Sequence, residues 1–450
     1  MGADDVPNRS APGRPVRHSD IFPPGTVAVG VGLVVTGITA YGYLLLTARV
    51  LGPTRYATVS VLWALVFLTG PGLFLPLQQE IGRLLARRRV EGLGGGPVVR
   101  RAAIFGAGLA TVVLIAAAIF AVPIVRHLFD GQVMLFAGLA CALVGYLLLT
   151  LVWGTLSGAG RFRSYALAQA SDGTLRLVVC IALAVVGVHR AGPYGLVLGL
   201  TPGIAALIGL RGNTDLLAPG PEAPWGDLSA ALGWLLLGSL GAQILANASV
   251  IAVKILATPA QQAQAGHFLA GLVIARVPLF LFGAVQAALL PRLASLAREG
   301  RYEEFRSGLG RLFGLVAIIA LVATGLCALV GPNVMRILFG ERFLLHRSDL
   351  TVLAAGSGIY MLALVVVQAI IALGLHARSA VCWIVGIAVL VLATALGTSL
   401  LARVEYGFLA GALAALLTAL LLLAPRLSGI ERAIDPGDLV VPTAALEFEP

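Results

Sequence analysis

Charged residues are scarce in this chain of 450 residues. Asp, Glu, Lys and Arg make up 12% of it, whereas 59% is hydrophobic, and the mean hydropathy is +0.96. This number of charged residues is too small to cover the surface of a soluble globular protein of this length. We therefore expect the chain to be embedded in a lipid bilayer. The formal net charge of +10 does not indicate nucleic-acid binding, because the basic residues fall mostly in short loops between apolar runs.

Cysteines and paired carboxylates are also scarce. The four cysteines are Cys141, Cys180, Cys327 and Cys382, and they lie singly in apolar runs without CxxC or other metal-ligand spacing. The longest predicted outer loop, residues 332 to 348, contains one acidic residue, Glu341. No pair of catalytic acids is evident, so we reject an enzyme such as a membrane glycosyltransferase or polymerase and expect no cofactor or metal.

Apolar runs of about 20 residues, each long enough to cross a bilayer, follow one another along the chain. We count twelve, near 25–50, 55–80, 102–125, 131–156, 165–188, 193–211, 228–255, 266–290, 311–331, 349–374, 379–402 and 406–425. The fold class we predict is an all-α integral membrane protein with twelve transmembrane helices. The polar segments 1–24 and 427–450 are predicted to be disordered cytoplasmic tails.

The arginines indicate how the chain is oriented. They gather in segments that would share a side with the N-terminus, such as 83–101 and 292–311. Basic loops remain in the cytoplasm, so both termini are predicted to be cytoplasmic, in the cytoplasmic (inner) membrane.

The Pro-rich segment 212–227 divides the spans into two six-helix lobes, 25–211 and 228–426, and we predict that it is a cytoplasmic linker. The two lobes carry similar short segments. Arg49-Val50-Leu51-Gly52 matches Lys254-Ile255-Leu256-Ala257, and Thr69-Gly70-Pro71 matches Arg276-Val277-Pro278. An even number of spans separates the copies, which predicts a parallel repeat about a pseudo-two-fold axis, as in many transporters.

Three basic residues of the predicted spans, Arg276, Lys254 and Arg49, are candidates for a cavity. A charge at membrane depth costs about 2.5 to 3.5 kcal/mol on insertion scales, so each needs a partner or a function. Arg276, beside Pro278 in span eight, is a candidate anion ligand in a cavity, or else it pairs within the protein. Lys254, the one lysine of the chain, and Arg49 either line that cavity or extend to the interface.

Amides and acids are the remaining polar candidates. Gln243 and Asn247 share a face of span seven, and these two amides and Gln286 either line a polar cavity or bond between helices. Asp172 and Arg176, four residues apart on span five, form either a structural ion pair or a coupling site.

Glu80 ends span two. It is either a proton-responsive carboxylate or an interfacial acid facing Arg83 or Arg87. Gly70, Pro71 and Pro278 allow their helices to bend, which makes them hinge candidates in a moving protein and packing features in a static one.

These residues resemble a known family. The segments Ala48-Arg49-Val50-Leu51-Gly52-Pro53 with Tyr56, and Arg276-Val277-Pro278-Leu279-Phe280 with Gln286 and Leu290-Pro291-Arg292-Leu293, are similar to polysaccharide flippases of the multidrug/oligosaccharidyl-lipid/polysaccharide exporter superfamily. The resemblance covers residues 25 to about 425. It implies a V-shaped transporter with two lobes, in which spans one, two, seven and eight line a cationic central cavity.

The resemblance also implies a cargo. It predicts that a lipid-linked oligosaccharide bearing a pyrophosphate, of the undecaprenyl type, passes from the cytoplasmic to the outer leaflet by alternating access. The expected partners are this glycan, membrane lipids, and polysaccharide polymerases or glycosyltransferases, with no nucleic acid. The alternative is an ion-coupled multidrug exporter of the same superfamily. That branch typically has a carboxylate in its first or seventh span, and neither span has one here.

Overall fold

The computed structural model describes residues 26–223, 231–279, 282, 293 and 295–429, and all regular structure in these ranges is helical. The elements are α1 (Thr26–Val90), α2 (Gly96–Ile119), α3 (Ala121–Pro123), the π-helix η2 (Ile124–Leu128), α4 (Val133–Gly158), α5 (Phe162–Val185), α6 (Ala191–Leu210), η3 (Thr214–Leu217), α7 (Ala231–Leu256), η5 (Pro259–Gln261), α8 (Gln262–Ala275), α10 (Tyr302–Phe339), α11 (Arg347–Ala372), α12 (His376–Leu396) and α13 (Leu400–Gly429).

The 65 residues of α1 form two antiparallel arms. A straight helix of this length would measure about 100 Å, roughly three times the apolar thickness of a bilayer. Gly52 interrupts it with φ 72° and ψ 170°, a conformation open to glycine. The two arms fold back on each other. A contact between them shows this, since the rings of Tyr43 and Trp63 stack with centroids 5.6 Å apart.

The gap of residues 51–54 between the first two predicted spans is narrower in the structure, because Gly52 is the one residue inside α1 with non-helical φ and ψ. Pro53 starts the second arm, where its fixed φ suits the first turn of a helix and its missing N–H costs no hydrogen bond. Residues 53–56 are helical.

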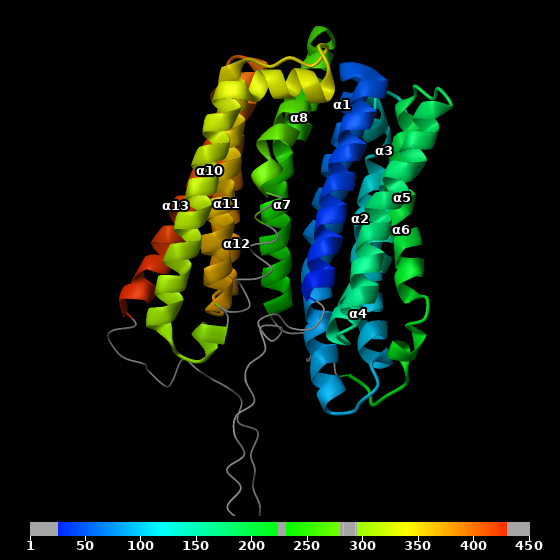
Figure 1. Ribbon diagram of the computed structural model, residues 1–450, viewed down its shortest axis with the longest axis vertical. Coiled ribbons are helices and arrows are strands. Elements are labelled where there is room, and N and C mark those ends of the chain that lie inside the picture. Colours follow the sequence, from blue (N-terminus) through cyan, green and yellow to red (C-terminus); the bar gives the residue numbers. More distant parts are fainter. Residues whose placement is uncertain (1–25, 224–230, 280–281, 283–292, 294, 430–450) are drawn as a thin grey trace, which may run out of the picture.

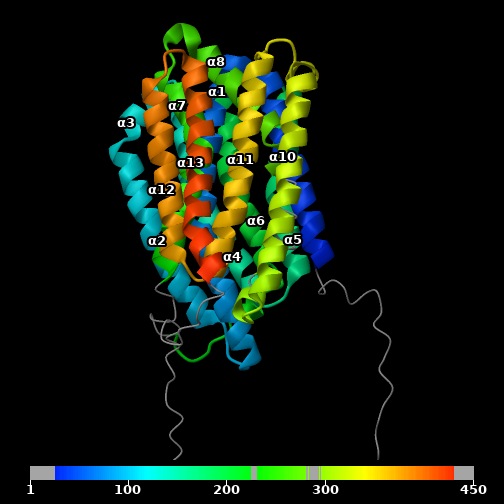
Figure 2. The same cartoon turned by 90° about the vertical axis from the view of Figure 1, so that its left-hand side faces the viewer.

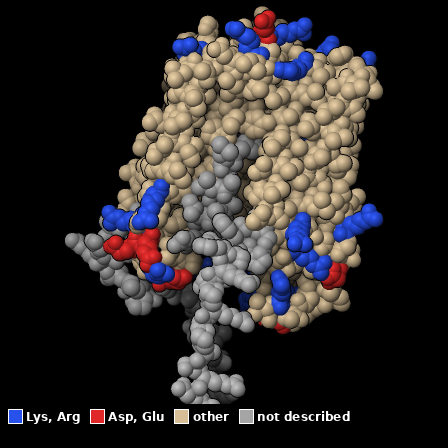
Figure 3. Space-filling model, viewed as in Figure 1, with Lys and Arg blue, Asp and Glu red and all other residues tan. Residues whose placement is uncertain are grey.

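The chain is a multi-pass membrane protein. Ten helices within the described ranges are long and apolar enough to cross a membrane, and α1 is one of them. In Figure 3 the basic and acidic side chains lie near the two ends of the molecule, with an uncharged band between them. The predicted total of twelve spans stays a prediction, because span eight continues beyond Ala275 into residues that are only partly described.

The long helices form two bundles. In Figure 1, α1 to α6 lie on the right and α10 to α13 on the left, with α7 and α8 between them, and Figure 2 shows these helices running along a common axis. We call α1–α6 the N-terminal bundle and α7–α13 the C-terminal bundle. The end at which α7 finishes and α8 begins is called the upper end. The predicted repeat symmetry and the exact lobe boundaries stay predictions.

The predicted tails and linker fall largely outside the described ranges. Residues 1–24 lie outside them, as do 224–227 of the linker and 430–450 of the C-terminal segment, whereas 427–429 belong to α13. The described start of the linker packs on the N-terminal bundle. Arg88 donates to the carbonyl oxygens of Gly94 (2.9 Å) and Pro221 (2.8 Å), and Arg161 pairs with Asp215.

Glycines allow α4 and α6 to pack closely. A Cβ atom built on Gly199 of α6 would lie 2.2 Å from the carbonyl oxygen of Gly138 on α4. A Cβ on Gly138 would in turn lie 2.6 Å from the carbonyl oxygen of Gly195. Helices in lipid associate through such close packing, because lipid is as apolar as the side chains and supplies no hydrophobic drive.

We predict that Gly199→Leu destabilises the protein by about 1 to 3 kcal/mol, because the new side chain must push α4 and α6 apart. Thermal unfolding of the purified protein would measure this. Gly108→Leu is the matched control, since Gly108 is exposed on α2 and a Cβ there meets no atom within 4 Å. Equal unfolding midpoints for both variants would contradict the prediction.

Candidate functional site

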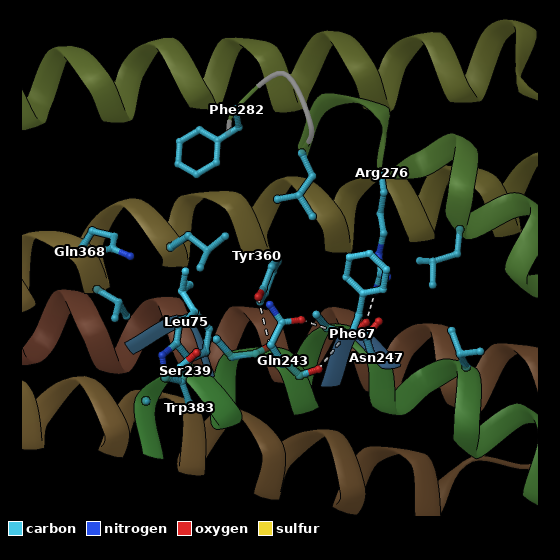
Figure 4. Close-up of a pocket in the computed structure, with 18 of the residues that line it drawn as sticks. Phe67, Leu75, Ser239, Gln243, Asn247, Arg276, Phe282, Tyr360, Gln368 and Trp383 are labelled. Carbon is cyan, nitrogen blue, oxygen red and sulfur yellow. Dashed lines mark hydrogen bonds between the residues drawn. The ribbon is translucent and has the colours of Figure 1, made fainter. Parts of the chain in front are cut away.

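A cavity of about 370 Å³ lies between the two bundles. Both arms of α1 line it from one side, and α7, α8, α11 and α12 line it from the other. Figure 4 labels ten of the lining residues, which are Phe67, Leu75, Ser239, Gln243, Asn247, Arg276, Phe282, Tyr360, Gln368 and Trp383.

Arg276 is held where α8 ends. The helix stops at Ala275, and Arg276 follows with φ −98° and ψ 1°. Pro278 explains this end, because it has no N–H to donate to the preceding turn. Since α8 starts at the upper end, its 14 residues place Arg276 about 20 Å below that end, at membrane depth.

The Arg276 guanidinium has no carboxylate partner among the described residues. One nitrogen donates to the carbonyl oxygen of Ala246 on α7, and the guanidinium lies 5.8 Å from the centre of the Phe408 ring. Of the described residues that line the cavity, Arg276 alone carries a charge. Among the described residues, a carbonyl dipole and an aromatic ring are therefore the groups that stabilise this positive charge.

The amides of α7 line the cavity as one of the two interpretations of the sequence predicts. Asn247 donates through Nδ2 to the backbone oxygen of Gln243 (3.0 Å) and to its side-chain Oε1 (3.1 Å). In Figure 4 Asn247 and Gln243 lie below Arg276 and beside Tyr360, and Ser239 and Gln368 lie further along the cavity. Gln286, the third predicted amide, lies outside the described residues.

Lys254 and Arg49, predicted as cavity candidates, are not among its lining residues. Lys254 donates to both carboxylate oxygens of Asp130, each at 2.8 Å, and to Oε1 of Gln262 at 2.6 Å. Arg49 donates through Nε to the carbonyl oxygen of Leu338 at 2.7 Å. Both cations therefore contact the opposite bundle near the upper end.

Asp172 and Arg176 form the predicted ion pair within α5, and both side chains are buried. Thr201 of α6 donates to the second carboxylate oxygen at 2.9 Å. The Arg176 guanidinium also lies over the rings of Tyr43 and Trp63 on α1, at 5.9 and 5.6 Å. This cluster joins α5 to α1 and α6. Trp63 also lines the cavity, whereas Asp172 and Arg176 do not.

Glu80 and the hinge candidates have local roles in this structure. Glu80 accepts from Arg83 at 3.0 and 2.7 Å, in the interfacial arrangement that was one of its two predicted uses. Gly70 packs closely on Tyr146, since a Cβ atom built on Gly70 would lie 2.9 Å from the ring. Helix α1 continues through Pro71. Pro278 follows the end of α8. Whether these residues act as hinges stays a prediction.

Sequence reasoning missed the contribution of α11 and α12 to the cavity. Tyr360 donates its hydroxyl to the carbonyl oxygen of Ala242 at 3.1 Å, and its ring lies 5.7 Å from that of Trp383. Gln368 also lines the cavity. Its position as a single amide within an apolar run was the feature of the sequence that could have indicated this. In the described ranges no three His, Cys, Asp or Glu side chains lie close enough together to hold a metal ion.

We predict that Arg176→Met destabilises the protein by about 3 to 5 kcal/mol, because it leaves Asp172 buried without its cation. The double variant Asp172→Leu with Arg176→Met removes both charges and recovers most of this loss. Asp215→Asn breaks an exposed ion pair and serves as the control, with a loss below about 1 kcal/mol. A double variant that is no more stable than Arg176→Met would refute a purely structural pair.

The chain is similar in sequence to uncharacterised proteins of two mycobacteria. It is 26% identical over 394 residues to one from Mycobacterium tuberculosis and to one from Mycobacterium bovis, covering 80% of this chain and 83% of each relative. No protein-family model matches the chain.

Solved structures of transporters resemble the fold closely. An inward-facing multidrug resistance MATE family transporter of the MOP superfamily has a TM-score of 0.69 at 15% identity, covering 91% of this chain and 99% of that one. An outward-facing structure of the same description has a TM-score of 0.64 at 16% identity, covering 91% and 96%. The chain therefore has the same fold as these MATE family structures.

Proposed function

We propose that this protein flips an anionic, lipid-linked glycan of the undecaprenyl-pyrophosphate type from the cytoplasmic to the outer leaflet, for cell-surface polysaccharide synthesis. The observation that carries the proposal is the charge of the cavity. Arg276 is the one charged residue among its described lining residues, and no described carboxylate pairs with it. A guanidinium at membrane depth matches the pyrophosphate of such a cargo.

The two acids that the sequence offers as cation ligands have basic partners in the structure. A carrier of cationic drugs needs a carboxylate that faces its cavity. Asp172 is buried against Arg176, and Glu80 accepts from Arg83, so the acids predicted for that role have basic partners. The described lining contains amides beside Arg276, which can hydrogen-bond the hydroxyl groups of a sugar chain.

The fold supports alternating access as the mechanism. The similar structures are described as inward-facing and outward-facing, so this fold is found in two states. In this chain the cavity reaches Gln79 on the second arm of α1 and Leu235 on α7, far from the upper end. Polysaccharide polymerases and glycosyltransferases are the enzymes expected to use or supply the cargo.

The alternative is export of cationic drugs. The specific observation in its favour is that the similar structures are described as multidrug resistance transporters. It predicts tight binding of a cation such as ethidium in the cavity, although the described lining has no acid to hold it. The two functions therefore predict opposite effects of removing the positive charge of Arg276. Binding of an anionic cargo would weaken, whereas binding of a cationic drug would strengthen.

We predict that Arg276→Ala weakens binding of undecaprenyl pyrophosphate by about tenfold to a hundredfold, because a charge-assisted hydrogen bond contributes about 1.5 to 3 kcal/mol. Binding is measured on protein in lipid nanodiscs. Arg276→Lys retains part of the affinity, since it keeps the charge but loses the planar fork. In cells, Arg276→Ala abolishes export of a surface polysaccharide at normal membrane levels of the protein.

Arg301→Ala is the control, because Arg301 is an exposed arginine paired with Glu304. It should leave pyrophosphate binding unchanged. Unaltered pyrophosphate binding in Arg276→Ala would sink the assignment of Arg276 as a cargo ligand. Ethidium binding that is tighter than pyrophosphate binding in the wild type would favour the drug exporter.

A further inference from the structure

Two basic residues connect the bundles near the upper end, one from each bundle. Lys254 belongs to α7 of the C-terminal bundle and reaches Asp130, which lies between η2 and α4 of the N-terminal bundle. Arg49 belongs to α1 of the N-terminal bundle and reaches the carbonyl oxygens of Ile337 and Leu338 in the last turn of α10. Each bundle therefore provides one cation to the other.

The Lys254 ammonium is fully satisfied and fully enclosed. Its three acceptors are two oxygens of Asp130 and one of Gln262, at 2.6 to 2.8 Å, which matches the three N–H donors of a lysine. The Lys254 side chain has 0% exposure, whereas Asp130 is 41% exposed. Separation of the bundles would leave a buried ammonium with Gln262 alone, so this contact favours the closed arrangement.

The local backbone presents Asp130 to Lys254. Asp130 has φ 48°, the one positive value among the described non-glycine residues. Asp and Asn tolerate this left-handed conformation better than other residues with a side chain. The turn holds the carboxylate just beyond the end of η2, at the edge of the opposite bundle.

Arg49 uses the end of a helix instead of an acid. The last carbonyl groups of α10 lack helical partners and carry the negative end of the helix dipole, which attracts a cation. Arg49 is exposed, so its contribution is smaller than that of Lys254.

The two contacts are equivalent under the predicted repeat. Arg49 ends span one and Lys254 ends span seven, so the two cations occupy matching positions. Their partners also match, because Asp130 follows the end of span three and Leu338 lies at the end of span nine. The contacts are therefore related as a reciprocal pair, in which the first span of each half binds the end of the third span of the other.

Close apolar contacts accompany the two cations. A Cβ built on Gly266 of α8 would lie 2.1 Å from the carbonyl oxygen of Pro53, so α8 and α1 touch through their backbones. The ring of Tyr56 lies 5.7 Å from that of Phe343 and 6.4 Å from that of Phe339. None of these residues lines the cavity, and all lie close to helix ends or to the Gly52 break at the upper end.

We propose that Arg49 and Lys254 form a reciprocal ionic clasp that holds the upper end closed and must break before the cavity can open there. The clasp comprises Arg49 with the α10 carbonyl groups and Lys254 with Asp130. It explains why two cations near span ends are absent from the cavity lining. It also explains the single lysine, since a compact ammonium takes three oxygens in an enclosed space where a guanidinium fork does not fit.

The test measures the distance between the bundles at the upper end. Spin labels are attached at Arg190→Cys and Glu341→Cys, two exposed positions in different bundles, after the four native cysteines are replaced by alanine. Double electron–electron resonance on the full chain in nanodiscs then gives the populations of the closed (short) and open (long) distances. The variants are Lys254→Met, Asp130→Asn, their combination, and Arg49→Gln.

Lys254→Met and Asp130→Asn should each lower the ratio of closed to open molecules about tenfold or more. Arg49→Gln should lower it roughly twofold to fivefold, as expected for an exposed contact. The combined Lys254→Met and Asp130→Asn variant should shift the ratio no further than the larger single change, because both remove one interaction. Asp215→Asn, which breaks an ion pair within the N-terminal bundle, should leave the distances unchanged.

The proposal is overturned if Lys254→Met and Asp130→Asn both keep the parent distances, or if their effects add fully in the double variant. Thermal unfolding of each variant separates opening from loss of fold. Asp130→Asn keeps the size and the left-handed preference of the residue and lies in a half-exposed turn, so it decides the question if Lys254→Met does not fold.

Discussion

The cost of placing charge in a bilayer constrains every polar residue of this protein. An ionised side chain at membrane depth costs about 2.5 to 3.5 kcal/mol on insertion scales, so its partner decides what it can do. Arg176 is neutralised by Asp172 inside one helix, and Lys254 by Asp130 across two bundles. Arg276 has a carbonyl oxygen and a ring, with no described carboxylate. That difference separates structural pairs, bundle contacts and the candidate cargo ligand.

Packing within a bundle differs from packing between bundles. Inside the N-terminal bundle, glycines such as Gly138 and Gly199 bring helix backbones into contact over adjacent turns, and separation would lose many dispersion contacts. At the upper end the bundles meet through two cations, the contact between Gly266 and Pro53, and a few rings. Helix α1 also packs along α7 and α8, and one apolar core extends from the N-terminal bundle to residues such as Val250 and Phe268. A movement of one bundle against the other must therefore break apolar contacts as well as the two ionic ones.

Local patterns in the sequence predicted local structure well. The spacing of Asp172 and Arg176 predicted their pair, and the apolar runs predicted the membrane helices. The partner of Lys254 could not be predicted, since Asp130 lies 124 residues away and no periodicity connects them. The cavity lining from α11 and α12 was missed for a similar reason, because a single amide or ring within an apolar run has no spacing that indicates which way it faces.

Helix α7 connects the cavity with the upper end. Its Ala246 carbonyl holds Arg276, and its Lys254, eight residues later, holds Asp130, about 12 Å further along one helix. A helix transmits displacement along its axis because its backbone hydrogen bonds keep its length. A shift of α7 relative to the N-terminal bundle must therefore stretch the Lys254 contact while it moves the oxygen that holds Arg276. The Arg276 cavity and the contact between Lys254 and Asp130 are thus linked by one helix, α7.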